Sequence, residues 1–308
     1  MTDRSQRIVA PLARWSSRIA LFSASLLAVG IPLHRFAAFP TPVTLNLFKV
    51  ALAGSALAVL VGMVALGQIW NRGHGGAINV AVGILLPLMI WAWPMTYLPA
   101  AFRLPPINDV STDLVNPPRF VSAAKQRPRD ANSAAYPGER FASEQQKAYP
   151  DLRPFIVDRS VEETFELVEE VVHKLKWKVA TVDPPADRTA RNGTLEATDR
   201  TLLVGFTDDI VVRVEGGVTQ ARVDVRSASR YGAGDLGQNA ARVRQFLTEM
   251  YARLESTAPL GVAGRKRPSA AALKRLKERG AQRAETRSAP DRARSNARHG
   301  RAQKETQR

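Results

Sequence analysis

The chain of 308 residues has a formal net charge of +16 and no cysteine, which excludes disulfides, zinc thiolate sites and cysteine nucleophiles. So basic a chain would suggest nucleic-acid binding if its charge were evenly spread. However, residues 1–102 carry seven Lys and Arg against one acid, residues 103–263 carry 22 against 23, and residues 264–308 carry 15 against four. Because the middle of the chain is neutral, we do not expect its folded part to bind nucleic acid.

Residues 1–102 predict a transmembrane region. They contain three uncharged stretches of 15, 22 and 28 residues, and the two longer stretches can cross about 30 Å of hydrocarbon as helices. No ionisable side chain lies inside these two stretches, which argues against a transporter. Gly54, Ala58 and Gly62 are spaced four apart, which favours close packing between helices in lipid. We assign the spans to residues of about 19–36, 50–70 and 77–99.

The first uncharged stretch permits two interpretations, because 15 residues of helix cover only about 22 Å. Either it is retained, which gives three transmembrane helices, or it is a signal-like segment that precedes two. No small-residue cleavage site follows it, so we favour a retained span. Both interpretations place the arginines before it in the cytoplasm and the C-terminal domain in the periplasm, beyond a bacterial inner membrane. The orientation reverses only if this stretch lies on the membrane surface.

The chain leaves the lipid bilayer through proline-rich sequence. Pro87 and Pro94 predict a kinked third span, and Trp93 and Tyr97 near its end are typical of the membrane interface. Residues 103–152 contain two Pro-Pro pairs and no periodicity, so we predict an extended linker there.

Residues 153–258 predict a compact domain. Ser160 and Glu163 form a capping box that begins an amphipathic helix ending at about residue 176. Asp235 is the expected N-cap of a final helix that runs through Leu254. Between the two helices, β-branched and apolar residues predict strands at residues 177–182, 194–198, 202–214 and 218–226. The predicted fold class is therefore α+β, with two helices packed on one face of an antiparallel sheet.

The last two strands are separated by Gly216-Gly217, which predicts a two-residue hairpin that pairs Glu215 with Val218. In that register one face of the hairpin is apolar and builds the core. The opposite face collects Asp209, Arg213, Arg222 and Asp224.

Residues 259–308 form a basic tail with few large apolar side chains, which predicts disorder. We expect truncation after Gly264 to leave the melting temperature of the domain unchanged. The tail is most simply a solvated segment; anionic lipid, a cell-wall polymer or nucleic acid are the partners that its charge would suit.

Four motifs in the predicted domain resemble those of a known family. They are Leu195–Thr198, Gly205–Arg213, Val223–Arg230 and Gly234–Arg242. Over about residues 103–258 the chain is similar to the bacterial domain of unknown function 1499, whose members often carry N-terminal membrane helices. The resemblance supports the domain and membrane assignments and implies no established reaction.

The candidate site consists of polar residues on the last two strands and the loop that follows them. Its carboxylates would suit metal or acid–base chemistry, but nearby arginines would neutralise them, so we predict no metal, cofactor or catalytic residue. Arginines and hydroxyls before a helix N-terminus would suit an anion. The structural alternative is that Arg226 and Arg230 pair with Asp208, Asp209 or Glu196. The nine candidate residues are Asp208, Asp209, Arg213, Asp224, Arg226, Ser227, Ser229, Arg230 and Asp235.

Two of these residues carry a specific expectation. We assign Asp224 and Arg226 to opposite faces of their strand, so that Asp224 pairs across the hairpin and Arg226 anchors the loop before Asp235. If Arg226 is half-buried, its replacement by alanine should cost on the order of 2 to 4 kcal/mol. The only histidine of the domain, His173, is expected to face solvent, and no Ser-His-Asp arrangement can be assembled from the spacing.

These observations favour a non-enzymatic, membrane-tethered module outside the cytoplasm that binds a partner or an anionic component of the cell envelope. One alternative is an envelope enzyme that uses Asp208, Asp209, Asp224 and Arg226. The other is a binder of nucleic acid or anionic lipid through the basic tail, which requires a cytoplasmic C-terminus.

Overall fold

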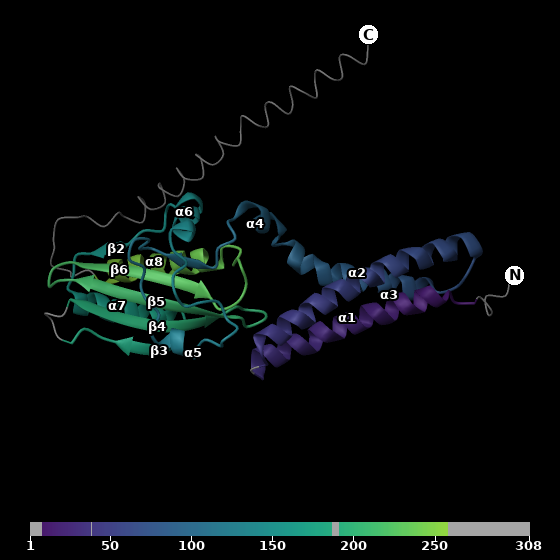
Figure 1. The fold of residues 1–308 in the computed structure, drawn as a ribbon, viewed down its shortest axis with the longest axis horizontal. Helices are drawn as coiled ribbons and strands as arrows, with labels where there is room; N and C mark the ends of the chain where they lie inside the picture. Colours follow the sequence, from purple (N-terminus) through teal and green to yellow (C-terminus); the bar gives the residue numbers. More distant parts are fainter. Residues whose placement is uncertain (1–7, 38, 187–190, 258–308) are drawn as a thin grey trace, which may run out of the picture. The chain divides into compact units, whose positions relative to one another are not determined.

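The computed structural model describes residues 8–37, 39–186 and 191–257 (Figure 1), so the predicted tail lies outside the described residues. Its first part is three long apolar helices, and each is long and apolar enough to cross a membrane. Three such helices were predicted. They are α1 (Pro11–Phe36), α2 (Thr41–Arg72) and α3 (Ala77–Met95).

Helix α1 is longer than its uncharged stretch suggested. It begins at Pro11, which suits a first helical position because proline lacks the N–H that would be unpaired there. Its 26 residues extend for about 39 Å, which removes the difficulty posed by an uncharged run of only 15 residues.

Small residues let these helices approach closely, as predicted. A Cβ added at Gly62 would lie 2.8 Å from the hydroxyl of Ser16, and one at Gly54 would lie 2.5 Å from the hydroxyl of Ser23. The Ser16 hydroxyl donates a hydrogen bond of 2.8 Å to the carbonyl oxygen of Ala58. In lipid the hydrophobic effect does not drive helices together, so close backbone packing and interhelical hydrogen bonds stabilise their association.

The proline-rich exit from α3 breaks the helix. Pro87 lies inside α3, and the helix ends at Met95, after Pro94. A short helix, α4 (Leu98–Arg103), follows after the turn at Thr96 and Tyr97.

The second part is an antiparallel sheet with two helices on one face (Figure 1). The order of the main strands is β1-β6-β5-β4-β3, and β2 also pairs with β6. The predicted fold class is confirmed. The strands are β1 (Asp109–Ser111), β2 (Phe155–Val157), β3 (Lys178–Asp183), β4 (Asn192–Arg200), β5 (Thr207–Gly216) and β6 (Ala221–Ser229).

Helices α7 (Val161–Lys174) and α8 (Gln238–Ser256) cover the core face. Ser160 caps α7 by accepting a hydrogen bond of 3.1 Å from the backbone N–H of Glu163, so half of the predicted capping box is observed. His173 near the end of α7 is exposed, as expected. Between the helices and the sheet lies an apolar core that includes Phe165, Trp177, Ile210, Val212, Val223, Val225 and Phe246.

The structure differs from the prediction over residues 103–152, which we expected to be an extended linker. Residues 109–111 form β1, which pairs with β6 at the edge of the sheet. Helices α5 (Ser122–Gln126) and α6 (Glu139–Ala148) follow. Phe120 and Ala123 pack on Val211 and Ala228, on the sheet face away from α7 and α8. The domain therefore begins near residue 109, and the segment that follows covers the outer face of its sheet.

The β5–β6 hairpin has a different register from the predicted one. Gly216 pairs with Ala221 and Glu215 with Arg222, so the turn lies between Gly217 and Gln220. The predicted pairing of Glu215 with Val218 is therefore wrong by four residues. Because four is an even number, each side chain keeps its predicted face.

Candidate functional site

The nine candidate residues are divided between the two faces of the sheet. Asp208, Ser227, Ser229 and Asp235 lie on the side of α8, whereas the other five lie on the opposite side, beneath the segment of residues 109–137. The structure therefore does not bring all of them into one site. The charged residues instead form four separate groups, and each group has its own ion pairs.

The first group centres on Asp224, which is fully buried. Its carboxylate accepts hydrogen bonds from Arg213 across the hairpin at 3.2 Å, from Arg222 at 3.3 Å and from the hydroxyl of Thr112 at 3.1 Å. Asp113 bridges the same two arginines at 3.0 and 2.9 Å. The predicted pairing of Asp224 across the hairpin is confirmed.

The second group centres on Arg226, which is 1% exposed. Its guanidinium donates two hydrogen bonds to Asp109, at 2.9 and 2.7 Å, and one each to the carbonyl oxygens of Pro118 and Ala134. Burial raises the pKa of the Asp109 carboxyl, and the hydrogen bond from Arg226 opposes this rise. Arg226 thus fixes the segment of residues 109–137, instead of the loop before Asp235 as predicted.

The assignment of Asp224 and Arg226 to opposite faces was wrong. Residues two apart in a strand share a face, and both side chains point away from α7 and α8 toward the segment of residues 109–137. As expected, they do not pair with each other: Asp224 pairs with Arg222, and Arg226 pairs with Asp109.

The third group is Asp209 with two arginines. The fully buried carboxylate accepts from Arg127 at 2.7 Å and from Arg230 at 2.7 Å. Two guanidinium groups around one carboxylate leave an excess of positive charge at this end of the sheet.

The fourth group lies under α8. Arg242 donates to Asp208 at 2.7 Å and to Asp199 at 2.9 Å. Asp235 accepts from the backbone N–H groups of Gly237 and Asn239 at the start of α8. Burial raises the pKa of Asp235, and these backbone hydrogen bonds oppose the rise. Because Asp235 occupies this helix N-terminus, it leaves less room for an external anion.

Glu196 has a role that sequence reasoning missed. Its carboxylate accepts hydrogen bonds from the backbone N–H groups of residues 121, 122 and 123 at 2.7 to 2.9 Å, and so caps the start of α5. Asp109 was missed in the same way. Both partners lie more than 70 positions away along the chain, so no local spacing could reveal them.

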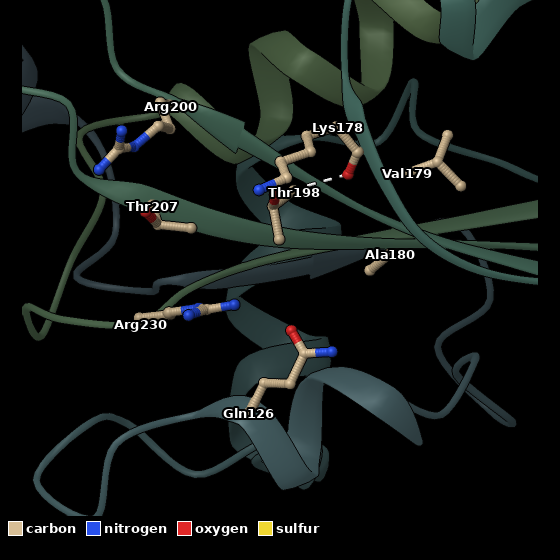
Figure 2. Close-up of a pocket in the computed structure, with 8 residues that line it drawn as sticks. All are labelled: Gln126, Lys178, Val179, Ala180, Thr198, Arg200, Thr207 and Arg230. Atoms are coloured by element: carbon tan, nitrogen blue, oxygen red, sulfur yellow. Dashed lines mark hydrogen bonds between the residues drawn. The ribbon is translucent and has the colours of Figure 1, made fainter. Parts of the chain in front are cut away.

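A cavity of about 540 Å³ opens on the sheet face away from α7 and α8 (Figure 2). Three cations line it from three strands or strand ends: Lys178 on β3, Arg200 at the end of β4 and Arg230 after β6. Figure 2 shows Arg230 and Gln126 pointing toward each other across it. Thr198, Thr207, Val179 and Ala180 complete the lining.

The electrostatics of this cavity favour an anion. Among the residues that the structure describes, no carboxylate lines the cavity, and Lys178 and Arg200 have no acidic partner. Hydroxyl groups and an amide beside the cations could donate further hydrogen bonds to an oxyanion. Of the nine predicted residues only Arg230 lines this cavity. Within the described part of the chain, no three His, Asp or Glu residues are grouped so that they could hold a metal ion.

Comparison with known proteins identifies the domain and leaves its function open. Residues 109–250 match the family described as "Protein of unknown function (DUF1499)". No curated protein matches the chain. Among solved structures, the vertebrate conserved region of human METTL16 matches 33% of this chain and 93% of its own, with 15% sequence identity and a TM-score of 0.25. A similarity at that level carries no argument about fold or function.

Proposed function

Because residues 109–250 form a domain of the DUF1499 family, whose description gives no function, we propose from the geometry that this protein is a membrane-anchored binding module for an anionic component of the cell envelope. The observation that carries the proposal is the cavity that Lys178, Arg200 and Arg230 line, in which no carboxylate of the described residues takes part. A phosphate or carboxylate group there would meet Lys178 and Arg200, which lack acidic partners among the described residues, and Arg230, which also pairs with Asp209.

The paired state of the buried carboxylates supports binding over catalysis. Asp208, Asp209 and Asp224 each accept from at least one arginine, whereas an acid–base catalyst needs a carboxylate that can exchange a proton with its substrate. This favours the module over the alternative of an envelope enzyme.

Our proposal places the domain outside the cytoplasm. Its support is the excess of arginine before the first apolar stretch, because basic residues are retained on the cytoplasmic side. A cytoplasmic C-terminus would instead favour the basic tail as a binder of nucleic acid or anionic lipid.

The proposal is tested by melting the full-length protein in detergent with increasing pyrophosphate. We expect pyrophosphate to raise the melting temperature of the wild type, because a ligand that binds only the folded state stabilises it by mass action. Arg200→Ala and Lys178→Ala should reduce this rise. Arg153→Ala, which removes an exposed arginine outside the cavity lining, is the matched control and should retain it. The same rise in Arg200→Ala and the wild type would refute the site.

A further inference from the structure

The loop between β4 and β5, residues 201–206, exposes two leucine side chains. Leu202 is 90% exposed and Leu203 is 51% exposed, whereas the next residue, Val204, is 2% exposed. The loop is ordered by its own hydrogen bonds, since the N–H of Thr201 donates to the carbonyl of Phe206 at 2.9 Å and the N–H of Gly205 donates to the carbonyl of Thr201 at 3.0 Å. A well-defined loop that presents large apolar side chains indicates an interaction surface.

The backbone of this loop contacts the C-terminal end of α1. The Nδ1 of His34 donates to the carbonyl oxygen of Val204 at 2.8 Å, while its Nε2 accepts from the hydroxyl of Thr41 at 3.0 Å. Arg35 donates to the carbonyl oxygen of Thr201 at 2.8 Å. Because a carbonyl can only accept, the first contact fixes the proton of a neutral His34 on Nδ1.

The depth of these contacts can be read along α2. The uncharged part of α2, residues 50–71, extends for about 33 Å, which matches the hydrocarbon thickness of a bilayer. Lys49 therefore marks the level of the lipid headgroups. Phe48, next to it, has its ring centroid 6.4 Å from that of Phe206 at the end of the loop. The Phe206 end of the loop thus lies near the level of the lipid headgroups.

Chain connectivity agrees with this position. With three spans, the α1–α2 turn and the end of α3 emerge on the same side of the membrane, whichever way the protein is oriented. The domain follows directly, since α4 ends at Arg103 and β1 begins at Asp109. So short a connection keeps the domain close to the bilayer surface.

We propose that residues 201–206 are a membrane-docking loop that inserts Leu202 and Leu203 into the bilayer beside the protein's own transmembrane helices. The partner of this surface is the lipid bilayer. Burial of both leucines among acyl chains removes their apolar area from water. The inference is independent of the ligand of the cavity.

The absence of cysteine in the chain allows a direct test with single labels. Leu202→Cys and Val218→Cys are labelled with bimane in the full-length protein, reconstituted in nanodiscs of phosphatidylcholine and phosphatidylglycerol with a lipid spin-labelled near the headgroup. Val218 is the matched control because it is also an exposed apolar residue, 62% exposed, and lies beyond the opposite end of β5. The ten residues of β5 separate the two positions by about 33 Å.

We expect the spin-labelled lipid to quench bimane strongly at position 202 and weakly at position 218. Equal quenching at the two positions, weak or strong, would overturn the proposal, because a docked loop must differ from the far end of the same strand. Leu203→Cys is the substitute if Leu202→Cys melts below the wild type, and the same outcomes apply to it.

Discussion

Arg226 connects segments of the domain that are far apart in the sequence. Its guanidinium is bound at once to Asp109 on β1 and to the carbonyl oxygens of Pro118 and Ala134. Its centre also lies 4.6 Å from the ring centroid of Phe120. One buried side chain on β6 thereby holds the segment of residues 109–137 on the outer face of the sheet.

We predict that Arg226→Ala destabilises the protein strongly. The substitution leaves Asp109, itself 2% exposed, as a buried charge without its guanidinium partner, which typically costs about 3 to 5 kcal/mol. Thermal melting of the full-length protein should show a drop of roughly 10 °C. Arg244→Ala is the control, because it removes an arginine from an exposed pair with Asp151 and should cost less than about 1 kcal/mol. Similar melting temperatures for the two variants would contradict this account.

In the β5–β6 turn, the two neighbouring glycines differ in how much space surrounds them. A Cβ at Gly216 would clash with the carbonyl oxygen of Gln220 and lie 2.8 Å from the Cα of Ala221. A Cβ at Gly217 would meet nothing within 4 Å. The two neighbouring glycines in the sequence therefore have different roles, and the first of them is required by the close approach of the two strands.

We predict that Gly216→Ala lowers stability by more than about 1 kcal/mol, because the added methyl group meets backbone atoms that cannot move aside. Gly217→Ala should change stability by less than about 0.5 kcal/mol, since its methyl group enters open space. The melting temperatures of the two variants, each compared with the wild type, test this prediction. If Gly217→Ala were as damaging as Gly216→Ala, the result would instead favour the two-residue turn predicted from the sequence, in which both glycines occupy the turn positions.

The sequence predicts those helices and strands whose signals lie within the element itself. Apolar residues at helical spacing locate α7, and the capping hydroxyl of Ser160 locates its start. Alternation predicts the faces of β5 and β6 even though the register was wrong. By contrast, β1 and β2 have three residues each and exist only because β6 offers its free edge to them. No periodicity can be detected in strands so short.

The candidate site was predicted only in part, because only some of its residues can be recognised from the local sequence. The charged residues on β5 and β6 were found because they stand out locally, but their partners Asp109, Asp113 and Arg127 come from the segment taken to be a linker. Two of the cations that line the cavity, Lys178 and Arg200, were not predicted, because an isolated exposed cation on a strand is common. Only the pairing of β3, β4 and β5 in the sheet brings them together.

The molecule as a whole combines three long apolar helices with a domain that directly follows them. In our proposal the three helices span the membrane, so that the turn between α2 and α3 lies on one side and the α1–α2 turn and the domain lie on the other. The docking loop and the cavity therefore face the same compartment. Which compartment that is depends on the distribution of arginine and lysine alone.

We predict that alkaline phosphatase fused after Arg308 is active and that the same enzyme fused after His74, in the α2–α3 turn, is inactive. The four arginines before the first apolar stretch, against Arg35 and Lys49 in the next polar segment, should retain the N-terminus in the cytoplasm, and three spans then place the domain outside. Alkaline phosphatase folds only where its disulfides form, outside the cytoplasm. Activity at His74 and none at Arg308 would reverse the orientation and favour the basic tail as the functional element. The docking loop would remain beside the membrane in either orientation, because the α1–α2 turn and the end of α3 always share a side.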